Sequence, residues 1–245
     1  MPQRKEKFIT GEIYHLTLRV LDDNLIFKDV NDYYRGIFSI YEFNNASPVS
    51  IFIRRRDRIV EKRREKVCDI GSRTILIEDE RDKYVEILAF SFMPNHIHLL
   101  VRQLKDNGIS KFMQKTGIGL AKYFNKKYGR KGYVFQDTFK SVRIKDDNQF
   151  KIVVPYIITN PTALIEPGWK EKGIRDHSTK EVIKFLENYK WSSYQDCIGI
   201  KNFPSVTQRD FLLEAMGGEK GLKDTVKNYL EYKKASKQHT DLFLE

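Results

Sequence analysis

The stretch YVEILAFSFMPNHIHLLV, residues 84–101, decides the fold. It contains two strongly apolar runs separated by Met-Pro-Asn at 93–95, and Pro and Asn are residues that favour tight turns. The stretch therefore predicts two adjacent antiparallel strands. The second strand begins with His96 and His98, and residues two apart on a strand face the same side of the sheet. Two imidazoles are thus expected to lie side by side on a central hairpin.

Outward from this hairpin, the chain alternates between strand-like and helix-like patterns. An upstream strand is expected at 11–21 and further short strands at 133–144, while helical periodicity runs through 29–45, 109–128 and 146–159, and again through 181–189, 208–216 and 221–234. These elements predict an α+β fold with a ferredoxin-like antiparallel sheet of four to five strands and helices on one face. A catalytic domain over 1–165, with a basic insertion near 48–80, and a helical C-terminal extension over 166–245 are expected.

Length and charge restrict the classes of partner. The chain has 245 residues, and 44 Lys and Arg against 33 Asp and Glu give a net charge of +11, which favours polyanions such as nucleic acid. Cys68 and Cys197 lack the spacing of a redox or zinc motif. No apolar run is long enough to span a membrane and the N-terminus does not resemble a secretory signal, so a cytoplasmic protein without membrane contact is expected.

The pair His96 and His98 is the sharpest local chemical feature. Their spacing on a strand allows both rings to reach one metal ion. Taken alone, two such histidines also occur as polar surface residues or as hydrogen-bonded core residues, so the pair by itself does not distinguish these roles.

A second pair follows on the predicted helix at 146–159. Tyr156 and Asn160 are four residues apart, a separation that places a phenol and a carboxamide on one helical face. The alternative is that Tyr156 packs by its ring and that Asn160 ends the helix before Pro161. The two pairs together favour a site over the alternative.

The chain resembles a known family at five places in one order. It is similar to the HUH single-tyrosine transposases, and most to the branch of the REP-associated tyrosine transposases. The resemblance spans residues 11–194 and rests on YHLTLRVLDDNLIF (14–27), FSFMPNHIHLLV (90–101), YFNKKYGRKGYVFQDTFKSVRI (123–144), YIITNP (156–161) and YKWSSY (189–194).

This resemblance implies roles for four residues. By motif match Tyr156 is the nucleophile, and His96, His98 and Asn160 hold a divalent metal, Mg²⁺ or Mn²⁺. A free Tyr has a pKa near 10, so a cation that polarises the scissile phosphate is needed for attack at neutral pH. The implied activity is cleavage and rejoining of single-stranded DNA that contains hairpins, REP-like or at transposon ends, through a 5′-phosphotyrosine. The family includes monomers and homodimers.

Two cationic surfaces are candidates for DNA contact, with solvated lysine and arginine as the alternative. One is the polar side of the helix at 109–128. The other is the segment from Arg54 to Lys66, whose eight cations against three anions give 8 − 3 = +5. The candidate residues are Lys111, Lys115, Lys122 and Lys126, Arg54, Arg55 and Arg56, and Lys140 on a predicted strand.

Two departures from the family pattern limit how far the roles of the family's residues can be carried over to this chain. The basic connection near 48–80 is longer than usual, and Pro155 precedes the nucleophile, where we expect a local irregularity of the helix. The alternatives are a replication initiator or relaxase of the same chemistry, and a non-catalytic or domesticated nucleic-acid-binding protein. Initiators usually carry a Lys shortly after the Tyr, and relaxases place the Tyr ahead of the His pair, so the order here favours a transposase.

Overall fold

Four strands form one antiparallel sheet in the part of the chain that the structure describes. The computed structural model describes residues 7–49, 53, 56, 79, 81–136 and 138–235. The sheet order is β2-β3-β1-β4, from β1 (Ile13–Arg19), β2 (Val85–Met93), β3 (His96–Gln103) and β4 (Lys140–Arg143). This order, with a helix between β1 and β2 and another between β3 and β4, is the ferredoxin-like arrangement. The predicted α+β fold with its ferredoxin-like sheet is confirmed, but helices cover both faces of the sheet and not the one face that was expected.

The hairpin of β2 and β3 joins an edge strand, β2, to a central strand, β3. Met93 pairs with His96 and Ser91 with His98, so the turn consists of Pro94 and Asn95 as the sequence indicated. Both turn carbonyls accept backbone hydrogen bonds from the segment that follows β1. The turn is thus held both by the pairing of β2 with β3 and by hydrogen bonds to the segment after β1.

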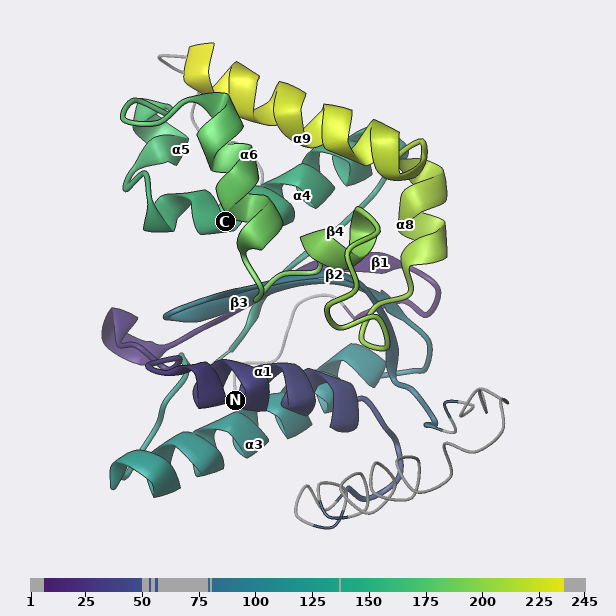
Figure 1. Cartoon of the computed structure of the whole chain (residues 1–245). Coiled ribbons are helices and arrows are strands. Elements are labelled where there is room, and N and C mark those ends of the chain that lie inside the picture. Colours follow the sequence, from purple (N-terminus) through teal and green to yellow (C-terminus); the bar gives the residue numbers. More distant parts are fainter. Residues whose placement is uncertain are drawn as a thin grey trace, which may run out of the picture.

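The first face of the sheet is covered by two helices, α1 (Val30–Glu42) and α3 (Gly108–Tyr128), which lie together below the sheet in Figure 1. Asp29 caps α1 by accepting from the Asp32 backbone N–H, and the Asp32 carboxylate accepts in return from the Asp29 N–H. Between the helices and the sheet lies an apolar core that includes Leu16, Ile97 and Phe112.

The second face is covered by the helix that carries Tyr156 and by the C-terminal helices (Figure 1). After α4 (Asp147–Thr159) come the short 3₁₀ helix Asn160–Leu164, α5 (Trp169–Lys172), α6 (Thr179–Asn188), α7 (Tyr194–Cys197), α8 (Arg209–Ala215) and α9 (Gly218–Ala235), while another 3₁₀ helix, Leu21–Asp23, follows β1. Leu100 of the sheet, Val153 of α4 and Val226 of α9 belong to one apolar cluster. The C-terminal helices therefore share a core with the sheet.

Pro155 lies inside α4, yet α4 is assigned as one helix from Asp147 to Thr159. The local irregularity expected at Pro155 is therefore not observed. At the end of the helix the Thr159 hydroxyl donates to the Pro155 carbonyl at 2.7 Å, and a 3₁₀ turn follows at Asn160–Leu164. No helix among the described residues is long and apolar enough to span a bilayer.

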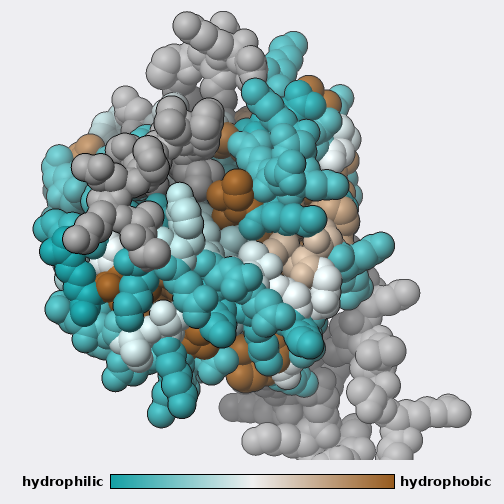
Figure 2. Space-filling view, turned by 90° about the horizontal axis from the view of Figure 1, so that it is seen from above, coloured by the Kyte–Doolittle hydropathy of each residue, from teal (hydrophilic) through white to brown (hydrophobic). Residues whose placement is uncertain are grey.

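The surface seen from the side of α9 is mostly hydrophilic, with apolar residues in small groups (Figure 2).

Two glycines of α3 give a matched test of this packing. An added Cβ would meet nothing within 4 Å at Gly117, but at Gly119 it would lie 2.1 Å from Phe43 Cε2. We expect Gly117→Ala to stabilise the protein by about 0.5–1 kcal/mol through helix propensity. Gly119→Ala should destabilise it by about 1–3 kcal/mol through overpacking. Urea unfolding measures the free energy of unfolding of both variants. A stabilising Gly119→Ala would contradict the packing of Gly119 against Phe43 at the end of α1.

Candidate active site

The structure brings together the four residues that the sequence singled out. His96 and His98 extend from β3 toward the second face of the sheet, and Tyr156 and Asn160 stand at the C-terminal end of α4 above them. The imidazole rings of His96 and His98 are 4.8 Å apart between centroids, and the Tyr156 ring meets His98 edge-on at 5.7 Å. The side chain of Asn160 lies near His96, where it acts against the lowering of the pKa of that ring. Two elements distant in sequence thus form one cluster.

Strand β1 orients the ring of His98. In the β1–β3 register Thr17 stands opposite His98, and His15 is two residues away on the same face. The Nδ1 atom of His98 lies 2.9 Å from His15 Nε2 and 3.2 Å from the Thr17 hydroxyl oxygen. Its Nε2 atom is buried and has no hydrogen-bond partner. One nitrogen of His98 is therefore held by the protein, while the other is available to a ligand.

His96 is oriented by its neighbour in the turn. Its Nδ1 atom lies 2.6 Å from the side-chain oxygen of Asn95. An amide oxygen only accepts, so Nδ1 carries the hydrogen and Nε2 presents a lone pair. The carboxamide of Asn160 lies near this imidazole. The amide nitrogen of Asn160 also donates weakly to the Tyr156 carbonyl, at 3.5 Å.

All three imidazoles of this cluster favour the neutral form. Burial lowers the pKa of His15 to about 4 and that of His96 to about 3, with the charge of Lys170 adding to the effect at both and that of Arg19 at His96. Burial, followed by the nearby His15 and His96, holds the pKa of His98 well below its usual range. Neutral imidazole is the form that binds metals. The three rings therefore keep unprotonated lone pairs at neutral pH.

Two imidazoles and one amide oxygen are the groups of the cluster that could hold a divalent cation. Among the described residues no group of three His, Cys, Asp or Glu side chains is arranged to hold a metal, so a site here would need a further ligand such as Asn160. The unpartnered Nε2 of His98 and the neutral state of both rings support this set. Three protein ligands would leave positions open for phosphate or water.

The hydroxyl of Tyr156 has a partner that sequence reasoning missed. Lys170 Nζ donates to Tyr156 Oη at 2.9 Å and lies 4.4 Å from the ring centroid. The Tyr156 ring also meets His15 edge-on at 5.7 Å, and only 2% of Tyr156 is exposed. His15 shares the strand face of Thr17, a period-two signal that could have marked it. Lys170 had no such signal.

The candidate DNA-binding cations lie in different places. Lys111, Lys122 and Lys126 are exposed on α3, on the opposite side of the sheet from Tyr156. Lys115, also on α3, donates to the carbonyls of two residues in the loop after α1, Asn45 at 2.5 Å and Ser47 at 3.1 Å. Arg56 is exposed, while Arg54 and Arg55 fall outside the described residues.

Lys140 is the candidate cation nearest to the cluster. It is exposed on the edge strand β4 and pairs with Thr17, so its side chain leaves the sheet on the same face as His98. It is therefore suited to contact a strand that approaches Tyr156 from the β4 edge.

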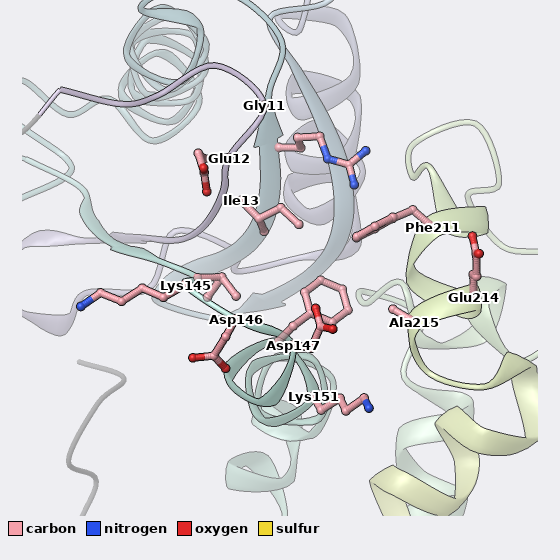
Figure 3. A pocket seen from close by; sticks show the side chains of 13 residues that line it. Gly11, Glu12, Ile13, Lys145, Asp146, Asp147, Lys151, Phe211, Glu214 and Ala215 are labelled. Carbon is pink, nitrogen blue, oxygen red and sulfur yellow. The ribbon is translucent and has the colours of Figure 1, made fainter.

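A separate cavity of about 520 Å³ lies at the opposite end of α4 (Figure 3). Its lining combines carboxylates and cations with apolar side chains, and the sticks in Figure 3 come from the start of β1, the start of α4 and the region of α8. The charged lining residues are Glu12, Arg102, Lys145, Asp146, Asp147, Lys151 and Glu214. None of the four clustered residues lines this cavity, and the mixed charges do not favour a polyanion.

Comparison with known proteins supports the resemblance found in the sequence. Residues 48–160 match the family model described as "Transposase IS200 like", a span that includes all four clustered residues but neither His15 nor Lys170. One similar solved structure is described as "Structure of the REP associates tyrosine transposase bound to a REP hairpin". It has 15% identity and a TM-score of 0.44, and the match covers 86% of this chain and 93% of that one. No curated protein matches the chain.

The buried imidazoles predict a pH-dependent stability. Because their folded pKa values are lowered, the unfolded chain binds protons first, near pH 6.5, and stability falls as pH drops from there toward 4. Carboxylates titrate mostly below this window. We expect the free energy of unfolding, measured in urea with chelator present, to decrease between pH 7 and pH 5. His15→Gln should make that decrease smaller, and an unchanged slope would contradict the assignment.

Proposed function

We infer that the chain belongs to the IS200-like transposase family, whose model matches the segment that contains His96, His98, Tyr156 and Asn160. From this premise we propose that the protein cleaves and rejoins single-stranded DNA, with Tyr156 as the nucleophile. The proposed substrates are strands that carry hairpins, either REP-like or at transposon ends.

The observation that carries the proposal is the unpartnered Nε2 of His98, whose ring meets that of Tyr156 edge-on. A buried polar atom without a hydrogen bond costs about 1–3 kcal/mol, and such atoms are rare in folded proteins. A purely structural histidine would be expected to use both ring nitrogens. Here one nitrogen is fixed by His15 and Thr17 while the other is left for a ligand, as in metal-binding histidines held by a neighbouring group.

His96, His98 and Asn160 would hold the metal, and the metal would supply Lewis-acid polarisation of the scissile phosphate. Imidazole and amide ligands suit Mn²⁺, while Mg²⁺ prefers oxygen ligands but is abundant in cells, so both ions are candidates. The metal is proposed to leave at least one position open for the DNA.

The reaction of Tyr156 is a transesterification. The phenol oxygen forms a bond to phosphorus as the bond to the 3′ oxygen breaks, and the phenol proton is passed to the departing 3′ oxygen, directly or through solvent. The products are a 5′-phosphotyrosine and a free 3′-hydroxyl. The energy of the phosphodiester is retained, so a 3′-hydroxyl can reverse the reaction and rejoin DNA without ATP.

A covalent adduct is the direct test of this function. A pool of hairpin oligonucleotides with randomised single-stranded flanks and a 3′ label is incubated with protein and Mg²⁺ or Mn²⁺, then separated on a denaturing gel. Wild type should form a labelled protein band that chelator abolishes. Tyr156→Phe should form none, while the exposed Tyr133→Phe serves as a matched control and should form it normally.

The outcomes of this test separate the assignments. A band that persists in Tyr156→Phe would show that the assignment of Tyr156 as the nucleophile is wrong. Binding of the pool without any band in wild type would favour a non-catalytic nucleic-acid-binding protein. A band in chelator, or full activity in His98→Ala, would remove the metal from the proposal.

Lys140 and Lys122 give a test of where the strand runs. Lys140→Glu should weaken hairpin binding and reduce its salt dependence, because Lys140 lies on the face and edge of the sheet that lead to Tyr156. Lys122→Glu, an equal change of charge on the opposite side of the sheet, should have the smaller effect. Filter binding over a salt series measures both, and a larger effect at Lys122 would place the strand along α3.

A further inference from the structure

The contact between Lys170 and Tyr156 joins the proposed nucleophile to a segment outside the matched span. Lys170 lies in α5, ten residues beyond the last residue of the family match, and its ammonium donates to the one atom of Tyr156 that would bond to phosphorus. Among the residues that the structure describes, Lys170 is the charged group that hydrogen-bonds this hydroxyl.

The placement of Lys170 is built by local structure. The preceding residue, Trp169, is 1% exposed and belongs to the apolar cluster that also contains Tyr156. Gly168 and Gly173 flank α5 with φ of +75° and +71°, a conformation that L side chains rarely adopt. The Trp anchor and the two glycine turns set this single helical turn over the end of α4.

The charge of Lys170 lies directly at the phenol. Its ammonium nitrogen is 2.9 Å from Tyr156 Oη and 4.4 Å from the centroid of the ring. In a buried setting such an interaction is stronger than in water. A cation at this position stabilises negative charge that develops on Tyr156 Oη or on a phosphate bound to it.

We propose that Lys170 is a catalytic residue of the transesterification, donating a hydrogen bond to Tyr156 Oη while that oxygen carries negative charge. This inference rests on the proposed function. During attack the phenol loses its proton as the oxygen–phosphorus bond forms, and Lys170 remains an ammonium throughout. During rejoining the same bond breaks, the electron pair returns to the phenol oxygen, and Lys170 again stabilises the charge until a proton arrives. The segment after residue 165 thereby contributes to the active site.

Two other roles for Lys170 make different predictions. A structural role, in which the ammonium only satisfies a buried phenol oxygen, would affect stability but not the rate once the protein is folded. A DNA-binding role would change affinity for the strand but not the rate at saturation. The test therefore measures stability, affinity and single-turnover rate separately.

The experiment uses the full chain with the hairpin pool described above. Lys170→Met removes the charge, Lys170→Arg retains it, and Lys172→Met, an exposed lysine of the same helix, is the matched control. We expect Lys170→Met to slow adduct formation and rejoining at saturating protein by about 10²- to 10³-fold, as for loss of one donor to an oxyanion. Lys170→Arg should recover part of the rate, and Lys172→Met should match wild type.

A second measurement reports on charge at the phenol oxygen itself. Replacing Tyr156 by 3,5-difluorotyrosine gives a phenol that carries negative charge more easily. The slowing caused by Lys170→Met in rejoining should become smaller with this residue, which a structural role would not produce. Hairpin affinity, measured in the Tyr156→Phe background, should be unchanged by Lys170→Met.

Each outcome decides between the hypotheses. Equal rates in wild type and Lys170→Met, a faster Lys170→Met, or a loss confined to affinity would overturn the role of Lys170 while leaving Tyr156 as nucleophile. A slowing that is equally large with difluorotyrosine would also overturn it. Absence of any adduct in wild type would overturn the proposed function and this inference together.

Discussion

The register between β1 and β3 is the constraint on which the rest of the site depends. Thr17 stands opposite His98 and Arg19 opposite His96, so both histidines and the groups that orient them leave the sheet on one face. The residues between them, including Leu16 and Ile97, fill the core under α1 and α3. A slip of one residue would send the imidazoles into that core and the leucines toward α4. Burial of the first face therefore secures the chemistry on the second.

The hairpin and the helix that carries Tyr156 could be predicted from sequence because their signals are local. Pro94 and Asn95 mark a turn between two apolar runs, and the spacing of Tyr156 and Asn160 places them on one side of a helix. The resemblance supplied the roles of the residues in these motifs, which local patterns alone left open. The family match includes the same four residues.

Local sequence patterns could not predict that His15 and Lys170 join the site. They also could not predict that the C-terminal helices cover the second face of the sheet. His15 becomes part of the cluster through pairing between strands 83 positions apart, and Lys170 through the folding of a short helix back over α4. Lys115 was a candidate for DNA contact because it lies on a cationic helical face. In the structure its ammonium instead donates to the carbonyls of Asn45 and Ser47. Each of these contacts depends on tertiary structure, which periodicity does not encode.

Burial gives the site its electrostatics and also limits access to it. Tyr156 and Asn160 are each 2% exposed, whereas His96, beside the hairpin turn, is the most accessible of the four at 9%. Cations surround the cluster. Arg19 stands opposite His96, Lys170 contacts Tyr156, and Lys140 is exposed on the β4 edge of the same face.

The most direct test of the central claim is the site of covalent attachment. After nuclease trimming and trypsin digestion of the trapped adduct, the peptide Ile152–Lys170 contains Tyr156 as its single tyrosine, so mass spectrometry can identify the modified residue without ambiguity. The account predicts that this peptide carries a nucleotide through a 5′-phosphotyrosine bond. A nucleotide found on a peptide with another tyrosine, with Ile152–Lys170 unmodified, would contradict it.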